Sequence, residues 1–223
     1  MGLTAPEVPA ESLATQTYRL LRKQIIVGKY PQGARLIEAQ LATDLHVSRI
    51  PIRAAMQQLE TDGFVRTLLR RSSRVTAWTE ASVTELFDVR LSLEMLAARL
   101  AAAQVHAGAT IDGLADAIEE EHRALESQDW LTIAEASTVF HERIVDLAGS
   151  DLLSSLMRAV TGRMTWLFYL TSGRDQHVQS NEHHSLLEAI ASGNERLAES
   201  VAYTHIEMGR TQSLEMILSR GHQ

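Results

Sequence analysis

The sequence contains no cysteine among its 223 residues, and only 5% of those residues are aromatic. Without cysteine, disulfide bonds and thiolate metal sites are excluded, and nothing indicates an oxidising compartment, so we expect a cytoplasmic protein. No stretch approaches the roughly 18 uninterrupted apolar residues of a membrane-spanning helix, and we expect no membrane partner. The 45% content of hydrophobic residues is typical of a soluble, helix-rich protein, and the length favours two modest domains.

Charge divides the chain unevenly near Trp78. Residues 1–78 contain 11 lysines and arginines against 6 acidic residues, a net charge of +5, whereas residues 79–223 contain 10 against 22, a net charge of −12. A basic N-terminal part on an acidic body indicates that the N-terminal part contacts a polyanion. We expect a flexible tail over residues 1–11, a first domain over 12–78 and a second domain over the remainder, 79–223.

Helical periodicity and turn residues organise the first domain. We expect helices over residues 11–27, 37–45 and 48–62. The third helix would begin at Ser48, a common N-cap residue, and would hold Pro51 in its first turn, where the missing backbone donor costs nothing. The segments FVRT and RVTAW then predict a small two-stranded hairpin. Helix, helix, turn, helix and hairpin is the order of a winged helix-turn-helix domain.

The third helix has two distinct faces. Its apolar residues follow the spacing of a core-facing stripe: Ile52, Ala55, Met56 and Leu59. Arg49 and Arg53 lie four residues apart on another face, from which a guanidinium group can reach guanine edges or phosphates of DNA. Arg70 and Arg71, at the hairpin tip, add a basic wing. A pair of arginines at this spacing is ordinary on a solvated helix face, but the complete motif favours DNA contact.

The second domain is predicted to be helical throughout. Ser82 and Glu85 fit a capping box that would open its first helix, which would end near Val105. Five further helices are expected, over residues 111–128, 130–148, 152–171, 178–191 and 195–219. The fold class is therefore mainly α, with an N-terminal winged helix-turn-helix domain followed by an all-α bundle of six helices.

Three histidines interrupt the inward faces of three different helices of the second domain. His141, His183 and His205 each share helical phase with neighbouring apolar residues. Neutral imidazoles that converge from separate helices can bind a divalent metal, and zinc, nickel, copper and iron all accept nitrogen ligands. Helical phase shows that these residues face inward and not that they meet, so a metal site and an empty ligand pocket both stay open.

Four segments of the chain carry a family resemblance: GARLIEAQLATDLHVSRIPIRAAMQQLETDGFV in the first domain, and ELFDVRLSLEMLAARLAA, FHERIVDLAGSDLL and EHHSLLEAIASGNERLAESVAYTHIEMG in the second. The first is similar to the DNA-binding signature of the GntR family of bacterial transcription regulators, and the others resemble the FCD domain of its FadR-like subgroup. The resemblance covers roughly residues 12–210. It implies a homodimer that binds a palindromic operator in double-stranded DNA. It also implies an FCD bundle that holds a divalent metal and a small carboxylate effector.

The resemblance also assigns roles to individual residues. Together with the N-capping serine and the wing, the implied DNA-binding set is Arg35, Ser48, Arg49, Arg53, Arg70 and Arg71. The metal histidines of the family fall on His141, His183 and His205, the three that helical phase selects. Arg90 matches an arginine of the effector cavity.

Two positions depart from the family pattern. Four residues before the first metal histidine, relatives carry an aspartate where this chain has Ser137. A dication bound here would keep uncompensated charge and an open position, which should favour an anionic effector beside Ser137 and Arg90. Ser72 stands where relatives have glycine at the wing tip, which changes the turn geometry expected there.

The leading interpretation is a transcriptional repressor that is controlled by a small carboxylate metabolite bound at a three-histidine metal site. One alternative is a regulator with a metal-free effector pocket. The other is a metallo-enzyme, because three histidines with an open position also describe a catalytic zinc site. The sequence shows no obvious inward carboxylate beside the histidines to act as a general base, and we therefore expect no enzyme.

Overall fold

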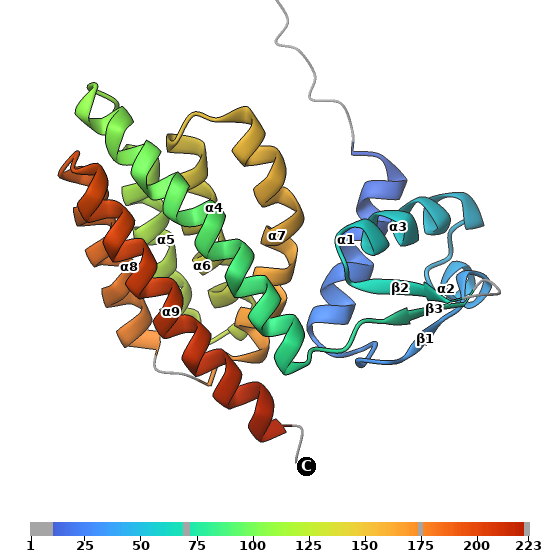
Figure 1. Cartoon of the computed structure of the whole chain (residues 1–223). Coiled ribbons are helices and arrows are strands. Elements are labelled where there is room, and N and C mark those ends of the chain that lie inside the picture. The colour runs from blue at the N-terminus through green and yellow to red at the C-terminus, as the bar shows by residue number, and fades with distance from the viewer. Residues whose placement is uncertain (1–10, 69–71, 174–175, 221–223) are drawn as a thin grey trace, which may run out of the picture. The chain divides into compact units, whose positions relative to one another are not determined.

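The computed structural model describes residues 11–68, 72–173 and 176–220. The chain divides into two compact units, with the boundary between Ala77 and Trp78 (Figure 1). Among the helices of these ranges, none combines the length and the apolar content that crossing a membrane requires.

The described part of the first unit combines three helices with a small antiparallel sheet. Its elements are α1 (Leu13–Ile26), β1 (Arg35–Leu36), α2 (Glu38–Asp44), α3 (Arg49–Thr61), β2 (Val65–Leu68) and β3 (Ser72–Val75). The strand order is β1-β3-β2, so β3 is central. The predicted hairpin is confirmed, because β2 pairs with β3. The third strand, β1, was not predicted, because a strand of two residues is too short to produce a periodic pattern in the sequence.

The α3 helix packs its predicted stripe into the core of the first unit. Its buried residues are Pro51, Ile52, Ala55, Met56 and Leu59. The main helical neighbour of α3 is α1, where Leu21 is fully buried. Ser48 occupies the N-cap with extended backbone, as predicted, but its side chain makes no capping hydrogen bond. Because the apolar stripe is turned inward, the face that carries the arginines is turned outward.

Six described helices form the second unit, as the sequence predicts. They are α4 (Glu80–His106), α5 (Asp112–Ser127), α6 (Trp130–Leu147), α7 (Asp151–Leu170), α8 (Gln176–Ala191) and α9 (Glu195–Arg220). The long helices α4 and α9 lie side by side (Figure 1), and α6 contacts both α5 and α7. The core of the second unit encloses several buried polar side chains, among them Glu94, His141 and His183.

The start of α4 differs from the prediction. Its N-cap is Thr79, and a capping box joins Thr79 to Ser82, with each side chain accepting a hydrogen bond from the backbone N–H of the other. The predicted box between Ser82 and Glu85 was wrong. The usual pattern ends in glutamate or glutamine, whereas here a serine hydroxyl fills the same role one turn earlier.

Candidate functional site

The exposed face of α3 carries two of the predicted DNA-contacting arginines. Arg49 and Arg53 are both exposed, and so is Ser48 at the helix N-terminus. Nε of Arg53 lies 3.5 Å from Oε2 of Glu38, and 65% of the Arg53 side chain is exposed. An exposed ion pair of this kind contributes little to stability and can be exchanged for another anion.

Three arginines line up across the sheet of the first unit. Arg74 of the central strand is paired in register with Arg35 on one side and with Arg66 on the other. All three residues are exposed, and like charges at directly opposed strand positions destabilise a sheet. Of these three arginines, the family resemblance implies a DNA contact for Arg35 alone, because the strand register that aligns Arg66 and Arg74 with it leaves no local pattern in the sequence. The predicted wing residues Arg70 and Arg71 lie outside the described residues.

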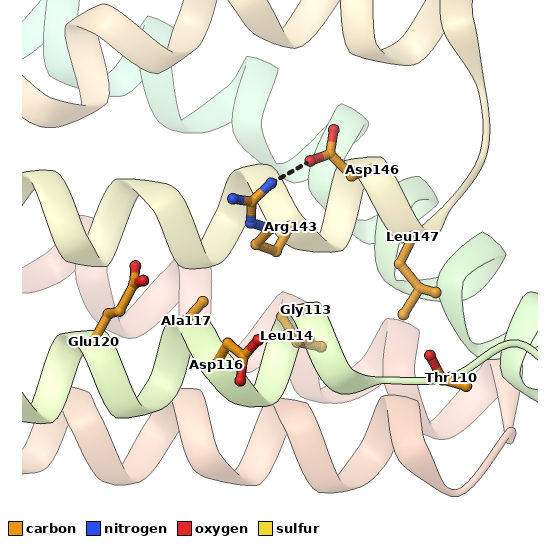
Figure 2. A pocket seen from close by; sticks show the side chains of 9 residues that line it. All are labelled: Thr110, Gly113, Leu114, Asp116, Ala117, Glu120, Arg143, Asp146 and Leu147. Atoms are coloured by element: carbon orange, nitrogen blue, oxygen red, sulfur yellow. Dashed lines mark hydrogen bonds and ion pairs between the residues drawn. The ribbon is translucent and has the colours of Figure 1, made fainter. Parts of the chain in front are cut away.

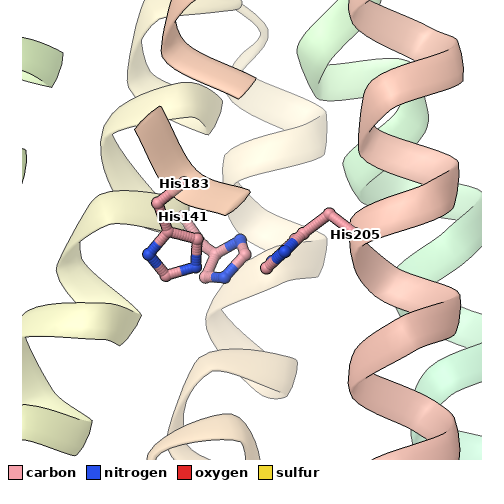
Figure 3. A group of neighbouring side chains, drawn as sticks. All are labelled: His141, His183 and His205. Carbon is pink, nitrogen blue, oxygen red and sulfur yellow. The ribbon is translucent and has the colours of Figure 1, made fainter. Parts of the chain in front are cut away.

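The three histidines selected from the sequence converge in the second unit (Figure 3). Their ring centroids are 5.1 Å apart for His141 and His183, 5.3 Å for His141 and His205, and 4.8 Å for His183 and His205. One nitrogen from each ring lies within 4.8 Å of the other two. All three side chains are buried, whereas the side chain of the adjacent His184 is 56% exposed.

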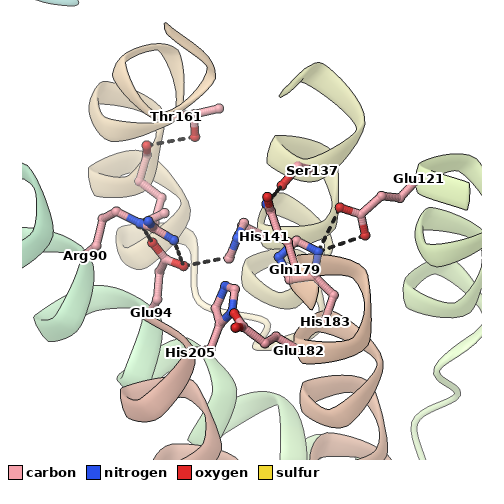
Figure 4. A network of polar contacts seen from close by, with 11 residues as sticks. Arg90, Glu94, Glu121, Ser137, His141, Thr161, Gln179, Glu182, His183 and His205 are labelled. Atoms are coloured by element: carbon pink, nitrogen blue, oxygen red, sulfur yellow. Dashed lines mark hydrogen bonds and ion pairs between the residues drawn. The ribbon is translucent and has the colours of Figure 1, made fainter. Parts of the chain in front are cut away.

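Two of the histidines are hydrogen-bonded to glutamates on other helices (Figure 4). Nδ1 of His183, on α8, lies 2.8 and 2.9 Å from the two carboxylate oxygens of Glu121, on α5. Nδ1 of His205, on α9, lies 3.0 Å from Oε2 of Glu182, on α8. A carboxylate at Nδ1 fixes the ring orientation and leaves Nε2 as the nitrogen available to a ligand. Nε2 of His183 is buried and has no hydrogen-bond partner among the described residues.

The third histidine contacts a glutamate that is itself held by an arginine. Nδ1 of His141 lies 2.7 Å from Oε2 of Glu94, at hydrogen-bond distance but away from the preferred angle. Both oxygens of Glu94 accept hydrogen bonds from Arg90, which is 2% exposed. The guanidinium of Arg90 also lies 5.0 Å from the ring centre of Phe87 and 5.2 Å from that of Phe168. Arg90, the predicted effector anchor, is therefore already engaged by a carboxylate of the chain.

Burial and neighbouring charge set the ionisation of this network. Burial would raise the pKa of Glu94, but Arg90 and His141 outweigh it and lower that pKa to about 2. Burial likewise would raise the pKa of Glu121, and the contact with His183 reverses the direction and lowers it. Burial lowers the pKa of His141 to about 4, because the opposing effect of Glu94 is smaller. At neutral pH these two glutamates are thus ionised and the His141 ring is neutral.

The expectation that no inward carboxylate lies beside the histidines was wrong. Glu94 shares helical phase with Arg90 and Ala97, and Glu121 shares it with Leu114 and Ile118, all of them buried. The phase test that selected the histidines would have found both glutamates. The formal charges of Glu94, Glu121, Glu182 and Arg90 sum to −2, which matches a divalent cation.

A small hollow adjoins the histidine cluster. It leaves about 10 Å³ for a water-sized sphere, which is room for one water molecule or ion. The described residues that line it are Glu94, Ala97, His141, Ile144, Leu186, Ala202, His205 and Ile206. The predicted effector residues Arg90 and Ser137 lie outside this lining. Ser137 is buried and accepts a hydrogen bond from Gln179.

A larger and more open hollow of about 380 Å³ lies where α5 faces α6 (Figure 2). Asp116, Glu120 and Asp146 contribute acidic groups to it, against the single guanidinium of Arg143. Nη1 of Arg143 already lies 3.1 Å from Oδ2 of Asp146. Because three carboxylates face one paired cation, this surface would repel a carboxylate ligand.

The chain is similar to known regulators along most of its length. The model of the FCD domain matches residues 85–208, and that of the bacterial regulatory proteins of the gntR family matches residues 13–75. An uncharacterized HTH-type transcriptional regulator of Bacillus subtilis, YdhC, is 28% identical over 93% of both chains. The probable D-xylose utilization operon transcriptional repressor of Paenarthrobacter nicotinovorans is 28% identical over 92% of this chain and 91% of its own.

A solved structure of a similar fold indicates the same family as these relatives. The crystal structure of a GntR transcriptional regulator from Rhodococcus sp. RHA1 superposes with a TM-score of 0.77 at 27% identity, over 92% of this chain and 99% of that one. The relatives are regulators and not enzymes. The winged helix-turn-helix unit and the six-helix unit are therefore those of a bacterial transcriptional regulator, and the chain belongs to the GntR family, with a C-terminal FCD domain.

Proposed function

We propose that this regulator is a repressor whose binding to a palindromic operator is controlled by a small ligand in the FCD domain. The observation that carries the proposal is a pair of buried ring nitrogens, Nε2 of His141 and Nε2 of His183, which have no hydrogen-bond partner among the described residues. A buried polar atom without a partner costs about 1–3 kcal/mol. Two such atoms turned into one cluster indicate that another group binds there.

A divalent metal ion fits the residues of this cluster. His141, His183 and His205 would hold it through neutral nitrogens, which suit zinc, nickel and similar ions. The surrounding net charge of −2 would balance the ion without the aspartate that Ser137 replaces. An ion with three protein ligands supplies an electrophilic position for an anionic group.

The proposed effector is a small carboxylate metabolite. The hollow beside the histidines holds no more than a water or an ion, so an organic effector requires side chains to move. Arg90 is the cation of the network, and an incoming carboxylate would compete with Glu94 for it. Ser137 would contribute a neutral hydroxyl close by. In the metal-free alternative, the unpartnered ring nitrogens would bind the effector directly by hydrogen bonds.

Operator binding as a homodimer is part of the same proposal. Two α3 helices that read half-sites roughly one helical turn apart require two-fold symmetry. The first unit is small, so the FCD domain is the expected source of the interface. Light scattering should give twice the chain mass of 24.7 kDa for the full-length protein. A monomer at the concentrations that saturate an operator would contradict the proposal.

Calorimetric titration of zinc or nickel into chelator-stripped protein tests the ligand site. Wild type should bind one ion per chain, and His141→Ala should abolish binding. His184→Ala is the matched control, because His184 is adjacent to His183 but exposed, and it should bind normally. A wild type that binds a dicarboxylate but no metal would favour the metal-free pocket, and His141→Ala should then weaken dicarboxylate binding.

A further inference from the structure

A large apolar side chain is exposed on the outward face of α3. Ile50 is 82% exposed, the largest value among the exposed large hydrophobic side chains of the described residues. It lies in the first turn of the helix, next to Arg49. The core of the first unit does not use this side chain, and isoleucine is a poorer helix former than alanine. Neither packing nor helix formation therefore accounts for isoleucine at this position.

The position of Ile50 on the helix relates it to the predicted DNA contacts. Residues four apart lie one above the other on a helix face. Ile50 and Ala54, both exposed, form an apolar strip that runs beside the exposed polar strip of Arg49, Arg53 and Gln57. The outward face of α3 thus offers hydrogen-bond donors along one line and methyl groups along the next.

These two lines match the chemistry of the major groove. Guanine offers acceptors that suit arginine, and thymine is the base that offers an apolar group there, its C5-methyl. The flanking guanidinium groups favour a polyanion over an apolar protein surface as the partner of this face. We propose that Ile50 contacts the C5-methyl group of a thymine in each operator half-site and makes thymine the preferred base at that position. The inference rests on α3 being the recognition helix.

Uracil substitution tests the contact, because deoxyuridine lacks only the methyl group of thymidine. A randomised duplex pool is first selected with the full-length wild-type protein, and the enriched duplex becomes the probe. Each thymine of one half-site is then replaced by deoxyuridine, and binding is measured by fluorescence anisotropy at fixed salt. One replacement should weaken wild-type binding by about fourfold, the value of one buried methyl group.

The variant Ile50→Ala completes the test. It should bind the thymine probe about as weakly as wild type binds a probe that carries the uracil in both half-sites, and it should not distinguish thymine from uracil at that position. The change should not harm folding, because Ile50 is exposed and alanine favours the helix. Leu20→Ala, at an exposed apolar residue on α1, is the matched control and should respond to uracil as wild type does.

Two outcomes would overturn the inference, and they are distinguishable from failure of the DNA-binding assignment. If no thymine of the half-site shows a methyl effect, or if Ile50→Ala retains the full effect, Ile50 does not read the methyl group. If the wild-type protein enriches no sequence at all, the assignment of α3 as a recognition helix fails and the inference fails with it.

Discussion

The side-chain amide of Gln179 donates a 2.7 Å hydrogen bond to the hydroxyl of Ser137, one turn before His141. One turn before His141 the chain thus holds a neutral amide–hydroxyl pair. The negative charge beside His141 comes instead from Glu94, on α4. The sequence-based expectation that Ser137 leaves a bound ion uncompensated therefore does not hold, because the carboxylates are supplied from other helices.

Glu94 should matter more for metal binding than Ser137. Glu94→Gln removes the carboxylate from His141 and leaves Arg90 buried without its anion, so zinc or nickel affinity should fall by about 10–100-fold. Ser137→Ala should change the affinity by less than about twofold, since its hydroxyl is engaged by Gln179. Calorimetric titration of both variants against wild type measures the difference. Equal losses of metal affinity in the two variants would show that Ser137 matters for metal binding as much as Glu94 does.

The arginines of α3 should determine operator binding. Arg49→Ala or Arg53→Ala should weaken binding by about 1–3 kcal/mol and relax the base preference, because a guanidinium fork is lost from the exposed face. Lys23→Ala removes an exposed charge from α1 and serves as the control. Fluorescence anisotropy on the selected operator at fixed salt checks the prediction. If both arginine variants kept wild-type affinity and specificity, α3 would not be the reading helix.

The three aligned arginines of the sheet, Arg35, Arg66 and Arg74, should lower the stability of the first unit and raise its affinity for DNA. Arg66 is directly opposite Arg74, so Arg66→Gln should stabilise the first unit by about 0.2–0.5 kcal/mol in urea unfolding. The same change should weaken operator and unrelated duplex alike and should reduce the slope of log K against log salt by about 0.9 for each bound protomer. Arg19→Gln, on α1, is the control charge removal. A variant of Arg66 that loses stability and keeps the salt slope would argue against repulsion in the row.

Tyr18 should make the first unit sensitive to high pH. Its hydroxyl donates a 2.6 Å hydrogen bond to Asp62, at the end of α3, and burial followed by this contact raises the pKa of Tyr18 above its usual value of 10. Because the folded pKa is the higher one, the stabilisation is complete below pH 10 and is lost as pH rises beyond it.

Tyr18→Phe should therefore cost about 1 kcal/mol at pH 7. The difference in unfolding midpoint between wild type and variant should shrink as pH rises above about 10. Thermal unfolding at pH 7, 9 and 10.5 measures that difference. A difference that is constant over this range would show that the phenol and Asp62 are not coupled.

The helices are predictable from the sequence because each repeats its apolar pattern over several turns. In α3, of 13 residues, the N-cap serine and four apolar positions agree with one another, and the structure confirms the helix almost to the residue. By contrast, β1 has two residues and depends on pairing with β3, which lies nearly 40 residues further along the chain. A pairing over that distance leaves no local signal, so the arginine row could not be predicted.

The glutamates were missed for a different reason. Arg90 and Glu94 have the spacing of an exposed helix pair, which is the common interpretation of such a pattern. Glu121 ends a run of three acidic residues, and a run of like charges usually indicates a solvated face. Both residues nevertheless share helical phase with buried neighbours, as the histidines do. Helical phase was informative at these positions, and residue type was misleading.

Each of the three histidine–glutamate contacts joins two different helices of the second unit. Glu94 ties α4 to α6, Glu121 ties α5 to α8, and Glu182 ties α8 to α9. A ligand that displaces one of the histidine rings therefore also displaces the carboxylate that contacts this ring from a second helix. Packed helices respond to such a displacement by shifting as rigid bodies. The α4 helix carries Glu94 and begins two residues after the boundary of the DNA-binding unit. A displacement of His141 is thereby linked, through the carboxylate of Glu94 and the continuous helix α4, to the point where the DNA-binding unit joins the second unit along the chain.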